Sequence, residues 1–83
     1  MPPPDPYPVL ARLVAGVCDL PEPGIAPGTR FDGLANWSSL AALRLLTSVE
    51  EHFRIHLELR GYLAAETVEG LSEMVADLLV APL

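Results

Sequence analysis

Phe31-Asp32-Gly33-Leu34-Ala35-Asn36-Trp37-Ser38-Ser39-Leu40 is the stretch that decides the fold, because it leads directly into the best helix of the chain. Either Ser38 or Ser39 can be the N-cap, since a serine hydroxyl accepts a hydrogen bond from a free N–H of the first turn. The segment from Leu40 to Phe53 then repeats apolar residues at helical spacing.

Two arcs of side chains follow from this spacing. We predict that one face, with Val49 at its border, is buried and consists of Leu40, Leu43, Leu46 and Phe53. The other arc holds Ala41, Arg44, Leu45, Ser48 and His52. We therefore predict that Leu45 is an exposed anchor for a partner.

Two further long helices flank this segment. The first spans Val9 to Cys18, where Cys18 is expected to be a small buried hydrophobe beside the apolar stripe of Leu10, Leu13, Val14 and Val17. Thr67 is predicted to cap the last helix, whose stripe is Leu71, Met74, Val75, Leu78 and Leu79. Between them, Gly61 limits Tyr62 to Ala65 to a short helical turn.

A long loop from Asp19 to about Trp37 separates the first two helices, because its prolines and glycines disfavour regular structure. Ile25, Phe31 and Leu34 are expected to fix the loop to the core, and Trp37 to plug the space between them. These patterns predict an all-α fold, a small antiparallel four-helix bundle with three long helices and one short one. We expect a flexible proline-rich arm over residues 1–8, the domain over residues 9–80, and a tail over residues 81–83.

Composition excludes several classes of protein. The 83 residues include 11 acidic and 5 basic ones, so the net charge is -6. Binding to nucleic acid or to an anionic membrane surface requires a basic face and is not expected. No apolar run approaches the roughly 18–20 residues that span a bilayer, and the first residues lack the pattern of a signal peptide. We expect a cytoplasmic monomer of a size that favours binding or carrying over catalysis.

The stretch before the central helix resembles the acyl carrier proteins, in which a loop ends in Asp-Ser-Leu and the serine opens the second helix. It is similar in particular to freestanding carriers with the motif Leu, two residues, Trp-Asp-Ser-Leu, which Leu34 and the segment from Trp37 to Leu40 match in spacing. In this family, apolar residues stand at fixed distances after the modified serine. The residues of this chain stand at those distances when they are counted from Ser39, but not when they are counted from Ser38. The matching positions are Leu40, Leu43, Leu46, Val49, Phe53 and Ile55.

This resemblance implies that Ser39 is the attachment site of 4'-phosphopantetheine, a covalent cofactor that a phosphopantetheinyl transferase takes from coenzyme A. It implies a non-catalytic acyl carrier with no catalytic residue, which we expect to serve polyketide-like or other specialised metabolism, and from the residues we expect no metal site. Its further partners would be an acyl-loading ligase or acyltransferase and a downstream synthase or modifying enzyme. The family's aspartate is Ser38 here, which keeps the cap but removes a negative charge. A peptidyl carrier and an unmodified interaction module are the alternatives.

Other groupings of polar residues support different chemistry only weakly. His52 and His56 are four residues apart, as in some zinc sites, but no suitable third ligand is near in the sequence. Ser39, a histidine and Asp32 could form a hydrolytic triad, yet no strand-turn-helix context accompanies them. A small hydrolase is therefore a third hypothesis, which predicts turnover of activated esters that is lost in Ser39→Ala.

Overall fold

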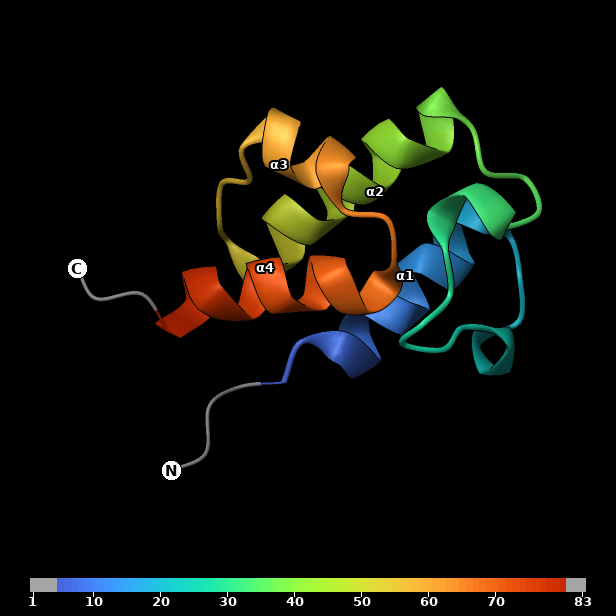
Figure 1. The fold of residues 1–83 in the computed structure, drawn as a ribbon, viewed down its shortest axis with the longest axis horizontal. Coiled ribbons are helices and arrows are strands. Elements are labelled where there is room, and N and C mark those ends of the chain that lie inside the picture. Colours follow the sequence, from blue (N-terminus) through green and yellow to red (C-terminus); the bar gives the residue numbers. More distant parts are fainter. Residues whose placement is uncertain (1–4, 81–83) are drawn as a thin grey trace.

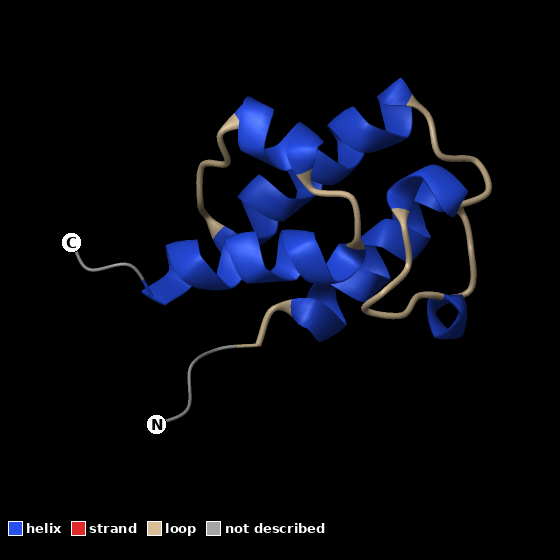
Figure 2. Ribbon diagram, in the orientation of Figure 1, coloured by secondary structure: helices blue, strands red, loops and turns tan. Residues whose placement is uncertain are grey.

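The computed structural model describes residues 5–80, which form four α-helices joined by loops (Figure 1). The helices are α1 (Tyr7–Cys18), α2 (Ser39–Phe53), α3 (Leu59–Ala64) and α4 (Val68–Val80). Within the described residues Figure 2 shows helices and loops without a strand. The predicted all-α bundle of three long helices and one short helix, with its long first loop, is confirmed. None of the helices in residues 5–80 is long and apolar enough to cross a bilayer.

The start of α1 lies earlier than the predicted Val9. Pro6 is its N-cap, and Pro8 falls in the first turn, where a missing N–H costs no helical hydrogen bond. Tyr7 and Pro8 thus belong to α1 and not to the expected arm, while residues 1–4 and the expected tail at 81–83 lie outside the described residues.

Side chains from three helices make the centre of the core. The largest side chains with almost no exposure come from α1, α2 and α4, namely Leu10, Val14, Cys18, Leu45, Val49, Val68, Leu71 and Val75. Burying an aliphatic side chain of this size contributes about 1.5–3 kcal/mol to folding. Cys18 is buried as predicted, and its burial raises the pKa of the thiol.

The predicted orientation of α2 is wrong for Leu40, Leu43 and Leu45, whereas Leu46 and Phe53 pack partly buried against the core as expected. Leu45 is 0% exposed, and with Ala41 and Val49 it forms the buried face, so it is a core residue and no exposed anchor. Leu40 and Leu43, which were expected inside, are 58% and 54% exposed. In the first turn of α2 the small Ala41 faces the core, and the larger side chains of Leu40 and Leu43 point outward.

The stripes of α1 and α4 are confirmed at their centres and differ at their edges. In α1, Ala11 and Ala15 are buried, while Leu13 and Val17 are only partly buried. In α4, Leu78 is 40% exposed, whereas Val68 at the start of the helix is fully buried. Small residues therefore form part of the buried face of α1.

The long loop is fixed to the core and to the start of α4. Ile25 and Phe31 are buried and Leu34 is partly buried, as predicted. Backbone hydrogen bonds join the loop to residues 66–69: Phe31 N–H donates to the Glu66 carbonyl at 3.0 Å and Val68 N–H to the Thr29 carbonyl at 3.0 Å. The loop also contains two short 3-10 turns, Glu22–Gly24 and Phe31–Gly33.

The predicted helical turn at Tyr62 to Ala65 is the six-residue helix α3, which begins at Leu59 and contains Gly61. A Cβ at Gly61 would lie 3.6 Å from the Met74 side chain, an ordinary van der Waals contact, so the helix does not require a glycine at this position. The Glu50 carboxylate accepts the Leu57 N–H at 2.8 Å and holds the chain between α2 and α3.

Candidate functional site

Ser38 is the N-cap of α2. It has extended backbone angles, and its hydroxyl accepts a hydrogen bond from Ala41 N–H at 3.1 Å. Its carbonyl accepts the Ala42 N–H at 2.9 Å, the first hydrogen bond of the helix. Of the two serines proposed from the sequence, Ser38 therefore caps the helix, and its side chain is engaged in doing so.

Ser39 is the first residue of α2 and is exposed to solvent. Among the described residues, no hydrogen-bond partner is found for the backbone N–H groups of Ser39 and Leu40. These free donors and the positive end of the helix dipole stabilise an anion placed at this position. The start of α2 thus fits a phosphate group attached to the Ser39 hydroxyl.

The loop before Ser39 is held at two points. The Asn36 side-chain amide donates to the Cys18 carbonyl at 3.0 Å, which fixes the end of the loop against the end of α1. Trp37 stacks on Phe31 with ring centroids 5.0 Å apart and an interplanar angle of 23°. Trp37 is partly buried against the core and plugs this junction as predicted. Ser39 consequently follows a segment of fixed geometry.

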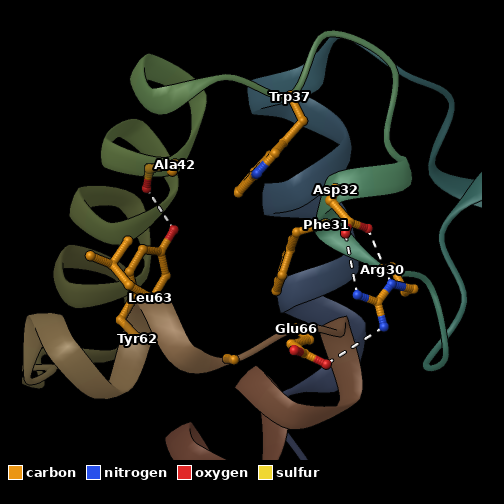
Figure 3. Close-up of a pocket in the computed structure, with 9 residues that line it drawn as sticks. Arg30, Phe31, Asp32, Trp37, Ala42, Tyr62, Leu63 and Glu66 are labelled. Atoms are coloured by element: carbon orange, nitrogen blue, oxygen red, sulfur yellow. Dashed lines mark hydrogen bonds and ion pairs between the residues drawn. The ribbon is translucent and has the colours of Figure 1, made fainter.

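A pocket of about 250 Å³ adjoins this segment (Figure 3). Its apolar lining comes from the loop, α2 and α3, and its rim is charged. The lining residues are Arg30, Phe31, Asp32, Trp37, Ala42, Tyr62, Leu63, Ala65 and Glu66. Ala42 lies three residues after Ser39, so the pocket and Ser39 share the first turn of α2.

Tyr62 joins the two helices at the pocket. Its hydroxyl donates a hydrogen bond to the Ala42 carbonyl, as Figure 3 shows. Burial raises the pKa of Tyr62 to about 12, because the charged phenolate would be poorly solvated there. The side chain is therefore a neutral donor at physiological pH.

The rim of the pocket is an exposed set of ion pairs. Arg30 contacts Asp32 at 3.1 Å and Glu66 at 3.5 Å. The hydrogen bond from Arg30 lowers the pKa of Asp32. Asp32 is thus bound to an arginine.

The structure does not form the hydrolytic triad considered from the sequence. Ser39 and His52 both lie in α2 and are 13 residues apart, which corresponds to about 20 Å along a helix. His56 lies beyond the end of α2 and contacts Glu50 at 3.2 Å through Nδ1. The two histidines therefore do not share a helix face. Within residues 5–80, no group of three histidine, cysteine or acidic residues could hold a metal ion.

Sequence reasoning missed most of the pocket. Arg30, Tyr62, Leu63 and Glu66 line it but were not selected, since α3 is short and the rim residues carry no local pattern. It also missed the exposure of Leu40 and Leu43 beside Ser39. The exposure of these leucines was missed because leucines at helical spacing usually form the face of a helix that meets the core.

The chain matches a known family over most of its length. A family profile described as "Phosphopantetheine attachment site" matches residues 8–75, which include most of α1, all of α2 and α3, and α4 up to Val75. No curated protein matches the chain.

Proposed function

Because the chain belongs to the phosphopantetheine attachment family, the family of the acyl carrier proteins, we propose that Ser39 is the residue that carries its covalent 4'-phosphopantetheine. Domains of this family carry the cofactor and meet phosphopantetheinyl transferases and partner enzymes, so the chain is a carrier domain. The observation that carries the proposal is the position of Ser39, exposed at the first residue of a 15-residue helix.

The hydrogen bonds around the cap favour Ser39 over Ser38. The Ser38 hydroxyl accepts the Ala41 N–H, so attachment at Ser38 would place a bulky group on the cap itself. Ser39 makes no such bond among the described residues, and its attachment leaves the cap intact. This supports the assignment that the spacing of Leu40, Leu43 and Leu46 from Ser39 suggested.

The chemistry required of the protein is modest. When bound, the cofactor supplies a thiol that holds an acyl group as a thioester. Ser39 presents its hydroxyl to the transferase, while the free N–H groups of Ser39 and Leu40 and the helix dipole stabilise the phosphodiester charge. The Ser38 cap and the Asn36 contact with α1 keep this end of the helix in place.

We propose an acyl cargo and a role in polyketide-like or other specialised metabolism. Asn36-Trp37-Ser38 stands before Ser39, where peptidyl carriers usually have glycines, and this favours an acyl over an aminoacyl group. The expected partners are an acyl-loading ligase or acyltransferase and a downstream synthase or modifying enzyme.

The pocket beside α2 is a resting place for a short cargo. Its volume of about 250 Å³ is slightly below that of common small-molecule sites, which measure roughly 300–1,000 Å³. Phe31, Trp37 and Leu63 give it an apolar lining. A short acyl or aryl group fits such a space better than a long alkyl chain does.

Intact-protein mass spectrometry tests the attachment site. Wild type, Ser39→Ala and the matched control Ser38→Ala are incubated with coenzyme A and a transferase of broad specificity. We expect one phosphopantetheine on wild type and on Ser38→Ala, and none on Ser39→Ala. Modification that survives in Ser39→Ala would refute the assignment. An unmodified wild type, with a known carrier modified in parallel and protein from the source organism also unmodified, would favour the interaction module.

A further inference from the structure

The exposed face of the first three turns of α2 has an unusual composition. It consists of Ser39, Leu40, Leu43, Arg44 and Thr47, which we call the Ser39 face. Leu40 and Leu43 are more than half exposed and lie within one turn of Ser39. Single exposed leucines are ordinary on protein surfaces. Two of them beside a residue that an enzyme must reach indicate a surface that is covered during that encounter.

The Ser39 face is positively charged, whereas the chain as a whole is negatively charged. The chain has a net charge of -6, yet it contains no aspartate or glutamate from Gly33 to Val49. Arg44 is five residues from Ser39, about 8 Å along the helix, whereas the exposed Glu51 is about 18 Å away. Within residues 5–80 Arg44 forms no ion pair. Arg44 is therefore the charged side chain nearest to Ser39 on the Ser39 face.

A groove beside the Ser39 face gives a partner somewhere to insert a side chain. It lies between α1 and α2, is lined by Gly16, Val17, Leu43, Arg44, Thr47 and Ser48, and has a volume of about 460 Å³. A Cβ at Gly16 would meet nothing within 4 Å, so the groove is open on the α1 side. The Thr47 hydroxyl donates to the Leu43 carbonyl at 3.1 Å, and Arg44 is the charged donor at the groove.

Resting on the proposed attachment at Ser39, we propose that the phosphopantetheinyl transferase of the source organism docks on the Ser39 face with an apolar surface over Leu40 and Leu43 and a carboxylate that pairs with Arg44. A transferase that reaches the Ser39 hydroxyl covers the adjacent turn of α2. Covering the leucines removes apolar surface from water, and covering Arg44 requires an opposite charge to compensate its desolvation. A transferase surface with a cation at that position would be repelled instead.

The rate of modification by that transferase tests the proposal. Initial rates are measured against carrier concentration for wild type, Leu43→Ala, Arg44→Glu and Arg44→Lys. The matched control is Arg54→Glu, which makes the same change of charge at the other end of α2, about 22 Å along the helix. Circular dichroism confirms that each variant is folded.

We expect Arg44→Glu to lower kcat/KM at least about tenfold, mainly through KM, and Leu43→Ala to lower it about fivefold. Arg44→Lys and Arg54→Glu should stay within about threefold of wild type. Arg44→Glu modified as fast as Arg54→Glu, or Leu43→Ala modified as fast as wild type, overturns the docking proposal while the attachment at Ser39 stands. A wild type that the transferase leaves unmodified overturns both.

Discussion

The hydroxyl of Tyr62 donates a hydrogen bond to the backbone carbonyl of Ala42, 20 residues earlier in the chain. This contact ties α3 to the first turn of α2 and closes one side of the pocket beside Ser39. The short helix α3 depends on it, because only one residue of that helix, Tyr62 itself, is buried.

Removal of this hydroxyl should destabilise the fold. We expect Tyr62→Phe to lower the free energy of unfolding by about 1–3 kcal/mol, since the ring still packs but the hydrogen bond is lost at a part-buried site. Urea unfolding followed by circular dichroism measures the effect. An unchanged midpoint would show that the bond contributes nothing to stability.

Stability should also fall at alkaline pH because of Tyr62. Burial raises its pKa to about 12 in the folded protein, above the value of about 10 for an exposed tyrosine. The contribution of Tyr62 is therefore complete below pH 10 and is lost as the pH rises from 10 to 12. Urea unfolding at pH 9, 10 and 11 should show a steeper decline for wild type than for Tyr62→Phe. Equal declines for both proteins would contradict this reasoning.

The orientation of α2 can be tested with two matched leucines. Leu45→Ala removes a fully buried side chain and should cost about 2–5 kcal/mol of unfolding free energy. Leu43→Ala removes an exposed side chain of the same size two residues earlier and should change stability by about 0.5 kcal/mol or less. Thermal unfolding of both variants compares them directly, and a larger loss for Leu43→Ala would reverse the assignment of faces.

The cap at Ser38 makes a separate prediction. Ser38→Ala should lower stability by about 1 kcal/mol, because Ala41 N–H loses its acceptor. Ser38→Asp keeps an acceptor for this N–H. Its negative charge at the start of the helix should raise the free energy of unfolding by about 0.3–1 kcal/mol above that of wild type. Ser39→Ala, one residue later, serves as the control and should stay near wild type. If urea unfolding shows that Ser38→Ala is more stable than Ser38→Asp, the result would argue against the role of Ser38 as the cap.

Trp37 should report whether cargo enters the pocket. It is the single tryptophan of the chain and lines the pocket beside Phe31. We expect its fluorescence emission to shift to shorter wavelength when a short acyl or aryl group is loaded, because the cargo displaces water from the indole. Loading of acetyl, a group too small to fill the pocket, provides the control. Identical spectra for all loaded forms would place the cargo in solvent.

The helices were predictable from the sequence because their signals are local. Ser38 and Thr67 act as caps, and Ile25 and Phe31 fix the loop, as the residue types suggested. The face of α2 was not predictable in this way. Its apolar residues form two arcs, and helical periodicity alone does not say which arc meets the core when the leucines near Ser39 are exposed.

The position of Ser39 at the start of a helix followed from the sequence, but the pocket beside it did not. The pocket depends on backbone bonds between residues 27–31 and residues 66–69, which are far apart in the chain. These bonds have no signature in local residue patterns, since they form only when the loop packs against the start of α4.

The burial of Cys18 makes the loaded protein easy to assay. It is the only cysteine in the chain, and its sulfur is hidden in the core. An aromatic disulfide reagent should therefore leave the unmodified, folded protein colourless. After the cofactor is attached, each free arm would release one equivalent of chromophore and each acylated arm none. A simple absorbance reading would then count how many carriers are charged, with no need to mutate the cysteine away.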